Sequence, residues 1–517
     1  MARTNLTINT SRLSFEDIDA FVSNTPPVDL SEKTKAVIHS SNQVVQKIIK
    51  SREPVYGVNT GFGKFSEIRI DNDKLSELQT RLVFSHAAGT GAAIPIPIVR
   101  LILLLKIKAL SLGHSGCRLE VVEQLVNMLN HNVIPFIPQK GSVGASGDLA
   151  PLAHLALVMM GEGTAYIPAK NDQWKQVSGK KALKTAGLKP IIFEAKEGLA
   201  VLNGTQVSTA YALWAWRKAR ILAKSADIIG AVTLEALLGT LTPFDPRIHR
   251  LRNHPGQRIV AANFRKILKG SPMVASHKEN DERVQDAYCL RCIPQVHGAV
   301  RDAITYVGQV LLREINSVTD NPLIFPDSGQ VLSGGNFHAA PIGYISDFLG
   351  IVLSDLANIS ERRIEHMQDA CVSFLPGFLT RTGGLNSGFM IAQVTAAALC
   401  SENKVLAHPA SVDSIPTSAN KEDHVSMATH AARKAVEIAD NLEMVLAVEL
   451  ISCCQALDLR TPLLPSRTTG AALEIVRTKI PYWKDDRQMY IDMEKARDII
   501  ESGDLISEVE KVCGPLH

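Results

Sequence analysis

The stretch MATHAARKAVEIADNLEMVLAVELISCCQAL, Met427 to Leu457, decides the fold class. Its apolar residues recur at the three- and four-residue spacing of an amphipathic helix, and it contains neither proline nor a cluster of turn residues. A second stretch of this kind runs from Leu199 to Gly239. Helices of roughly thirty to forty residues are longer than one globular core needs and are typical of bundles. The sequence therefore predicts a long-helix bundle that forms an oligomer.

Shorter segments repeat the helical pattern, and the alternation expected of strands is sparse. The further helices that we expect are Glu120–Asn130, Leu149–Gly161, His297–Asn316, Ile342–Met367 and Asn386–Asn403. The fold class expected is therefore mostly α. We expect three parts: an N-terminal domain over residues 1–200, a central long-helix bundle over 201–463, and a more charged helical tail over 464–517 that packs on the core.

The composition excludes several classes of protein. The chain has 517 residues and a formal charge of +3, and it contains no block of lysines and arginines that would track phosphates. The N-terminus lacks the apolar core of a secretory signal, and charged residues interrupt the most apolar helical stretches. The eight irregularly spaced cysteines suit reduced thiols, and the lone pair Cys289 and Cys292 predicts no metal site. We expect a cytoplasmic protein that binds neither nucleic acid nor membranes.

The glycine-rich loop GSVGASGDLAP, Gly141 to Pro151, invites several interpretations. It has neither the P-loop spacing nor the dinucleotide-binding spacing. It also fails as a hydrolase elbow, because Asp148 stands where that motif needs its last glycine. An ordinary helix entry, with Asp148 before an apolar helix, explains the loop when it is read alone.

The triplet Ala145-Ser146-Gly147 also permits an unusual reaction. If the nitrogen of Gly147 reaches the carbonyl carbon of Ala145, the backbone can cyclise, and loss of water turns Ser146 into an exocyclic alkene. Small neighbours permit this close approach, and glycine tolerates strained backbone angles. The product is an electrophile, although the triplet alone predicts it only weakly.

The loop does not stand alone, because GSVGASGDLAPLAH and six further motifs together resemble the aromatic amino-acid ammonia-lyases. The six motifs occur in family order and cover most of the chain: YGVNTGFG (56–63), GLAVLNGTQ (198–206), VQDAYCLRC (284–292), NSVTDNPL (316–323), SGGNFHA (333–339) and SANKEDHVSMAT (418–429). In that family, the residues that match Ala145, Ser146 and Gly147 form the prosthetic group 4-methylidene-imidazol-5-one (MIO). The resemblance implies a carbon-nitrogen lyase that needs no dissociable cofactor and no metal.

The resemblance also implies an architecture and a substrate. Family members are helical homotetramers of the fumarase-aspartase-like type, with active sites shared between subunits. The pair Ser85-His86 resembles the members that act on histidine, and Glu422 agrees with it. An imidazole needs a polar partner at each end, whereas a phenyl ring would leave both partners unpaired at a cost of about 1 to 3 kcal/mol each. We therefore expect L-histidine as substrate, with trans-urocanate and ammonia as products of the first step of histidine degradation.

The family pattern also implies roles for individual residues. Tyr56 takes the β-proton, and because a phenol has a pKa of about 10, a donor or cation is expected beside it. Arg291 pairs with the substrate carboxylate. The other residues expected in the site are Asn203 and Tyr288, which stabilise developing negative charge, Gln285 near the substrate, Phe337 beside the prosthetic group, and His86 and Glu422 on the imidazole.

Two alternatives remain open at this point. One is a related enzyme of the family, a tyrosine or phenylalanine ammonia-lyase or an aminomutase. The other is a helical scaffold without catalytic activity, which the joint presence of Tyr56, Ser146 and Arg291 disfavours. Three positions depart from the pattern expected of histidine-specific members: Lys421 beside Glu422, Ala340 and Ala287. An ion pair between Lys421 and Glu422 would weaken the hold of this carboxylate on imidazole.

Overall fold

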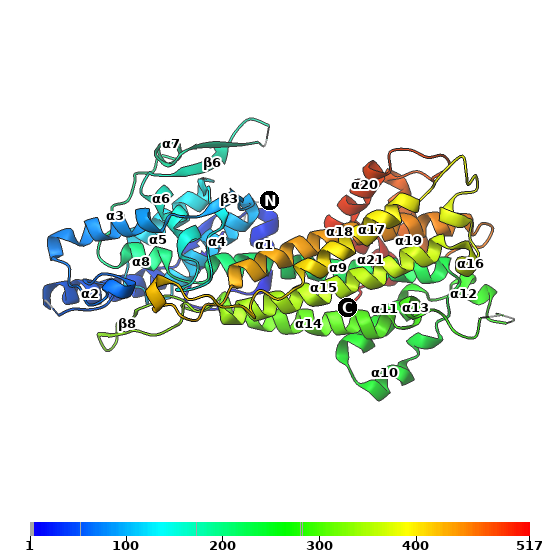
Figure 1. Ribbon diagram of the computed structural model, residues 1–517, viewed down its shortest axis with the longest axis horizontal. Coiled ribbons are helices and arrows are strands. Elements are labelled where there is room, and N and C mark those ends of the chain that lie inside the picture. Colours follow the sequence, from blue (N-terminus) through cyan, green and yellow to red (C-terminus); the bar gives the residue numbers. More distant parts are fainter. Residues whose placement is uncertain (1–4, 52, 172, 280, 282) are drawn as a thin grey trace. The chain divides into compact units, whose positions relative to one another are not determined.

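The computed structural model describes residues 5–51, 53–171, 173–279, 281 and 283–517. Helices make up most of the described chain and the strands are short, which confirms the predicted mostly α class (Figure 1). The chain divides into two compact units. The first comprises Met1–Trp214, Gln309–Ser346 and Pro409–Arg433, and the second comprises Ala215–Gly308, Asp347–His408 and Lys434–His517. The boundaries expected near residues 200 and 464 stay a prediction.

The first unit contains four small sheets within its described residues. One is parallel and three are antiparallel, and none has more than three strands. Their members are β1 (Leu6–Ile8) with β2 (Val28–Leu30), β3 (Thr90–Ala93) with β5 (Pro138–Lys140), β4 (Ile134–Pro135) with β6 (Thr164–Pro168) and β7 (Trp174–Ser178), and β8 (Leu323–Phe325) with β9 (Gln330–Leu332).

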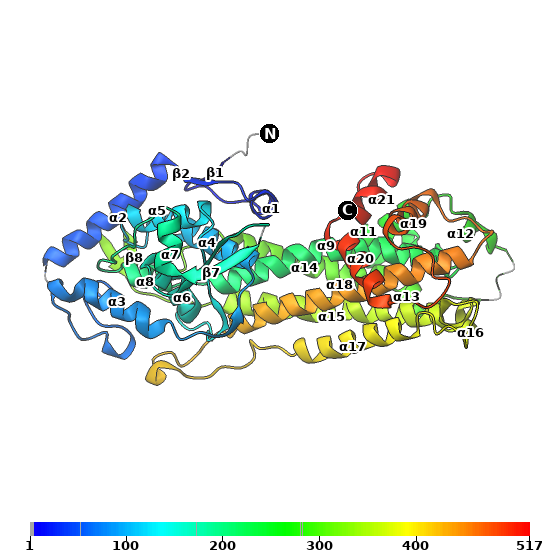
Figure 2. The same cartoon turned by 90° about the horizontal axis from the view of Figure 1, so that it is seen from above.

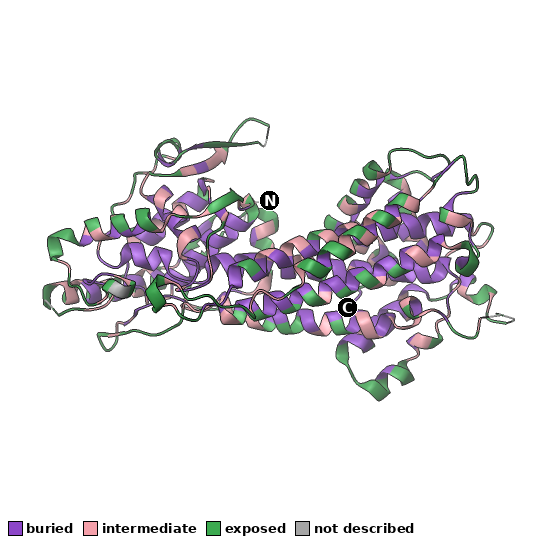
Figure 3. Ribbon diagram, in the orientation of Figure 1, coloured by how far each residue is buried: buried purple, intermediate pink, exposed green. Residues whose placement is uncertain are grey.

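The core of the first unit includes α4 (Ile96–Leu110), which is buried on nearly every side. Most of its residues are aliphatic, but Lys106 and Lys108 are buried among them. Buried residues likewise line the inner faces of the surrounding helices (Figure 3). These helices are α1 (Phe15–Asn24), α2 (Glu32–Ser51), α3 (Leu75–His86), α5 (Leu119–Asn130), α6 (Leu149–Met159), α7 (Gly179–Thr185) and α8 (Glu197–Leu202), and the short 3-10 turns are Gly63–Phe65, Asn72–Lys74 and Ser418–Asn420.

Four long helices are divided between the units: α9 (Gln206–Ala236), α14 (Ile293–Glu314), α15 (Ala340–Gln368) and α18 (Ala428–Leu459). The helix predicted over Met427–Leu457 is confirmed as α18. The single helix predicted over Leu199–Gly239 is wrong, because the chain breaks between α8 and α9. Asn203 has extended backbone angles, and Gly204 has a φ of +121°, which no α-helix accommodates.

The second unit contains the remaining helices. Its α17 (Met390–Leu406) lies along α15, where Gln393 Nε2 donates to Glu361 Oε1 at 2.7 Å (Figure 2). The other helices are α10 (Pro246–Arg252), α11 (Pro255–Ile267), α12 (Pro272–Ser276), α13 (Tyr288–Arg291), α16 (Ala370–Ser373), α19 (Arg467–Lys479), α20 (Met489–Glu501) and α21 (Asp504–Cys513), with 3-10 turns at Thr242–Phe244 and Gly377–Leu379.

Candidate active site

The loop that carries Ala145-Ser146-Gly147 is tightly bent. Ser146 has a φ of +49° and Gly147 a φ of +77°, a left-handed conformation that costs a serine free energy. Gly147 lies against Gly204, and a Cβ on Gly147 would stand 2.2 Å from the carbonyl oxygen of Gly204. Only glycine fits at this position, and the strain at Ser146 is held in place by the neighbouring chain.

Asp148 anchors this loop to another helix. Its buried carboxylate precedes α6, as the helix-entry interpretation expects, but it makes no capping bond there. Instead, Oδ2 accepts from the backbone nitrogens of Val207 and Ser208 at 3.0 and 2.8 Å, and Oδ1 accepts from Thr429 Oγ1 at 2.5 Å. Asp148 therefore caps the first turn of α9 and connects the reactive loop (residues 141–148) to the start of α18.

Glu422 contacts the reactive loop directly. Ser146 Oγ donates to Glu422 Oε1 at 2.8 Å. The other carboxylate oxygen accepts from Thr417 Oγ1 at 2.9 Å and from Ser418 Oγ at 2.6 Å. Among the described residues Lys421 forms no ion pair with Glu422, so the competition considered above does not arise in this chain.

Tyr56 and His86 lie in the same unit as this pair. Burial is the main cause that raises the pKa of Tyr56, the backbone N–H of Gly63 lowers it, and the nearby carboxylates of Glu422 and Asp320 raise it further. The expected donor is therefore present, but the net shift of the pKa is upward. Within this chain Tyr56 is a weaker acid than a free phenol.

His86 is held in one tautomer. Its Nδ1 lies 2.8 Å from the carbonyl oxygen of Leu82, and since a carbonyl only accepts, Nδ1 carries the proton. Burial lowers the pKa of His86, which favours the neutral ring. The Nε2 atom of the neutral ring is therefore an acceptor.

Asn203 closes the α8 helix and is buried. Its Nδ2 donates to Asp320 Oδ1 at 3.2 Å and to the carbonyl oxygen of Asn321 at 3.0 Å. Its Oδ1 is buried without a hydrogen-bond partner among the described residues. An unpaired buried oxygen is costly, and it marks a position where a further group is expected.

Three predicted residues belong to the second unit. Tyr288 is 70% exposed, and the guanidinium of Arg291 lies 4.5 Å from the centre of its ring. Arg291 Nε is buried without a partner in the described part of the chain, and Gln285 is exposed. The first unit holds Tyr56, His86, Ala145, Ser146, Gly147, Asn203, Glu422 and the half-buried Phe337, so one unit does not contain the whole predicted set.

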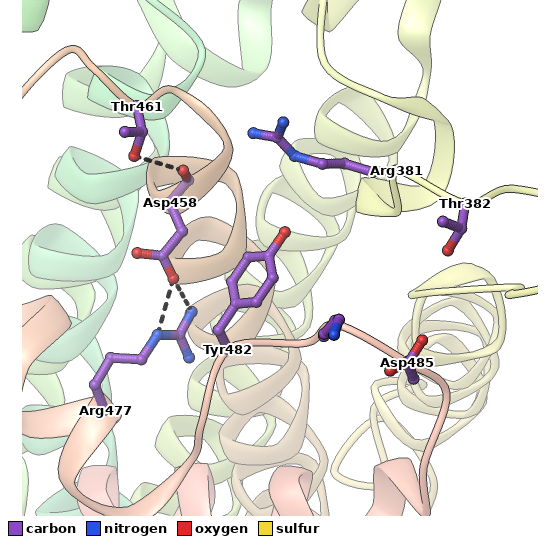
Figure 4. A pocket seen from close by; sticks show the side chains of 8 residues that line it. Arg381, Thr382, Asp458, Thr461, Arg477, Tyr482 and Asp485 are labelled. Atoms are coloured by element: carbon purple, nitrogen blue, oxygen red, sulfur yellow. Dashed lines mark hydrogen bonds and ion pairs between the residues drawn. The ribbon is translucent and has the colours of Figure 1, made fainter.

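The second unit also contains a hollow of about 630 Å³ (Figure 4). None of the predicted site residues lines it. The Arg477 guanidinium in its wall is already paired with Asp458 Oδ2, at 2.9 and 2.6 Å, and it donates to the carbonyl oxygen of Ile480. The hollow is therefore separate from the candidate active site.

The aromatic amino acid lyase family matches residues 13–478, and the chain belongs to this family. One relative is the histidine ammonia-lyase of Caldanaerobacter subterraneus, which is 50% identical over 98% of this chain and 98% of the relative. Another is the histidine ammonia-lyase of Myxococcus xanthus, which is 47% identical over 98% of this chain and 99% of the relative. The structure of histidine ammonia-lyase from Trypanosoma cruzi is similar with a TM-score of 0.90 at 40% identity, covering 99% of this chain and 96% of that one. Tyrosine aminomutase from Streptomyces globisporus has a TM-score of 0.91 at 34% identity, covering 98% and 99%.

Proposed function

We propose that this protein removes ammonia from L-histidine without oxidation and releases trans-urocanate, as a carbon-nitrogen lyase. The observation that carries the proposal is the full-length match to histidine ammonia-lyases at 47–50% identity. The site supports it, because the Glu422 carboxylate and Nε2 of a neutral His86 are both acceptors, which pair with the two N–H groups of a protonated imidazole ring. A phenyl substrate would leave His86 Nε2, and after dehydration of Ser146 also Glu422 Oε1, without the partner that an imidazole supplies.

We propose that Ala145, Ser146 and Gly147 become the MIO group. Family membership implies it, and the loop fits it: the turn is already tight, the left-handed strain lies at Ser146, and Gly147 has no room for a side chain. When formed, the group supplies an electrophilic alkene that activates the substrate amine as a leaving group. Asn203 and Phe337 are the residues proposed to border it.

The chain's own residues are assigned as follows. Tyr56 takes the β-proton, Arg291 holds the carboxylate, and Tyr288 and Asn203 stabilise negative charge, with Gln285 beside the substrate. Arg291 has no ion-pair partner among the described residues, which suits a group that awaits a carboxylate. The raised pKa of Tyr56 means that a further donor or cation is required before it acts as a base near neutral pH.

We propose that this requirement is met in a homotetramer, where residues of one subunit complete the site of another. Exposed apolar side chains on α15 and α17 of the second unit support an oligomer: Phe348 and Ile351, and Ile391 and Val394. Light scattering of the purified protein tests the tetramer. A mixture of Tyr56→Phe and Arg291→Ala proteins, refolded together, should regain part of the activity that each lacks.

We also propose that the protein works in the cytoplasm. One described helix, Ala340–Gln368, is long and apolar enough to cross a membrane, but 61% of its most apolar window is buried inside the protein. A buried helix of this kind is typical of a protein core. Fractionation of cells that produce the protein tests this assignment.

The function is tested by incubating the purified protein separately with L-histidine, L-tyrosine and L-phenylalanine. Ultraviolet absorbance follows the conjugated acid, and chromatography detects a β-amino acid, the product of an aminomutase. Turnover of histidine is expected, whereas turnover of tyrosine or phenylalanine alone would refute the substrate. The match to tyrosine aminomutase makes the aminomutase the second candidate. Ser146→Ala should abolish the activity. Formation of MIO is expected to remove two water molecules from the peptide that spans Gly141 to Pro151, and Ser146→Ala should abolish this loss of mass as well.

A further inference from the structure

Lys106 is buried, and it contacts Asn203 in the turn between α8 and α9. Its Nζ donates to the carbonyl oxygen of Asn203 at 2.6 Å and to that of Ala200 at 3.4 Å. Lys106 is 1% exposed, and its partners at hydrogen-bond distance within the described chain are only neutral carbonyls. Burying an ammonium without a direct counter-ion is costly, so an aliphatic residue would suit this apolar helix better if packing were the only requirement.

A second buried lysine holds the side chain of the same asparagine. Lys196 Nζ pairs with Asp320 Oδ2 at 2.7 Å, and both side chains are buried. Asp320 Oδ1 in turn accepts from Asn203 Nδ2 at 3.2 Å. Lys196 also has a φ of +72°, a conformation that costs a lysine free energy and that the surrounding contacts must maintain.

Asn203 is therefore fixed at both ends. Lys106 holds its backbone carbonyl, and Asp320 and Asn321 hold its Nδ2, which leaves Oδ1 as the buried atom without a partner among the described residues. The next residue, Gly204, packs against Gly147, so Asn203 lies close to the reactive loop. An amide fixed at three points is preorganised, which is what a group that stabilises charge requires.

We propose that Lys106, together with the Lys196–Asp320 pair, is a positioning residue that orients Asn203 for the reaction. The inference rests on the proposed function, because it assigns Asn203 to the stabilisation of charge. The charged and titratable groups around Lys106 are Asp320, Asp148, Lys196 and Cys117. Neither Lys106 nor any of these four groups needs to touch the substrate.

The test compares Lys106→Met with Lys108→Met. Both lysines lie on α4, both are 1% exposed, and both donate to two backbone carbonyls. The partners of Lys108 are Asn9 and Ser11, which are not part of the candidate site. Lys106→Met should lower kcat for L-histidine by about 10- to 100-fold, the cost of misplacing a catalytic group, with KM nearly unchanged. Lys106→Arg should restore part of kcat, and Lys108→Met should keep the wild-type kcat.

A double-mutant cycle shows whether Lys106 acts through Asn203. In an Asn203→Ala background, Lys106→Met should change kcat by less than about twofold, because the side chain that it positions is gone. A full loss in that background, or an equal loss of kcat in Lys108→Met, would overturn the proposal. If Lys106→Met does not fold, Asp320→Asn enters the same cycle with the same expected result.

The mass of the peptide that spans Gly141 to Pro151 separates this proposal from the proposed function. In Lys106→Met the peptide should keep the loss of two water molecules expected of the wild type, because the lysine acts on the reaction and not on ring formation. An unprocessed peptide in this variant alone would overturn the positioning role. A wild-type protein that does not turn over histidine would instead refute the proposed function.

Discussion

At the scale of single residues, Glu422 is held in place by hydroxyl groups on both of its carboxylate oxygens. Three hydroxyl groups, from Ser146, Thr417 and Ser418, donate to its two carboxylate oxygens. The segment that carries it is strained, since Ser418, Ala419 and Asn420 all have positive φ angles. Such strain persists only where the surrounding structure maintains it, which is common at functional sites.

The first prediction concerns the charge of Glu422. Glu422→Gln keeps the shape and one acceptor oxygen but replaces a charge-assisted bond to imidazole by a neutral one. We expect kcat/KM for histidine to fall about 10- to 100-fold, which corresponds to about 1 to 3 kcal/mol. Asp423→Asn, a change at the exposed neighbouring residue, is the matched control. Equal kinetics in the two variants would contradict the assigned role.

Much of this residue-level description could be predicted from the sequence, because the motifs carry their chemistry in short stretches. Tyr56, Ser146 and Glu422 were expected from such motifs, although their roles stay proposals. The bond from Ser146 to Glu422 was not predictable, since 276 positions separate the two residues. Lys106 was also missed. Its only sequence signal is a charge within the apolar run of Ile96–Leu110, where burial by tertiary packing decides its role.

At the scale of elements, Asp148 connects three helices through one carboxylate. It precedes α6, accepts from the first turn of α9, and binds Thr429 in the first turn of α18. Burial raises the pKa of Asp148, and these hydrogen bonds offset part of that effect. The position of the reactive loop therefore depends on the start of two long helices.

The second prediction concerns this connection. Asp148→Asn places an amide among five donors, and if its oxygen stays with the backbone nitrogens of α9, its NH2 group replaces the acceptor of the Ser142 and Thr429 hydroxyls. We expect a loss of about 3 kcal/mol of unfolding free energy and incomplete dehydration of Ser146. Asp245→Asn, at the ordinary cap of α10, should leave the stability nearly unchanged, because asparagine caps a helix as well as aspartate does, and it should leave the loop mass unchanged. Chemical denaturation and peptide mass spectrometry measure both effects.

The long helices were predictable because an apolar face recurs along many turns, and α18 ends within two residues of its expected limits. The break at Asn203–Thr205 was not predicted, because Gly204 follows helix-forming residues and no proline marks the end of α8. Its cause is tertiary: Gly147 packs against Gly204, and Lys106 binds the preceding carbonyl. Periodicity within a segment cannot contain such information.

At the scale of the whole molecule, the buried Lys106 makes the free energy of unfolding depend on pH. Burial, partly offset by Asp320 and Asp148, lowers the pKa of Lys106 from 10.5 to about 7. Between these values the unfolded chain binds a proton that the folded chain does not, so the free energy of unfolding rises with pH across this window. Below about pH 7 the cost of the buried charge is fully present.

The third prediction follows from the rise of the unfolding free energy with pH. The Tm of Lys106→Met minus that of the wild type should be most positive near pH 6 and should decrease steadily as the pH rises toward about 10. Lys33→Met, which removes the same charge from the exposed face of α2, should show a difference that does not vary with pH. Differential scanning calorimetry across this range measures both. A constant difference for Lys106→Met would contradict the titration.

The hydrogen bond from Ser146 to Glu422 also sets an order of events during the life of the protein. As long as Ser146 keeps its hydroxyl, it occupies the carboxylate oxygen that is proposed to receive the imidazole. In the proposed function, dehydration of the serine removes this hydroxyl and leaves the carboxylate oxygen free to accept another hydrogen bond. In this proposal, a newly made subunit contains a group that competes with the substrate for Glu422, and this oxygen becomes available only when the electrophile has formed.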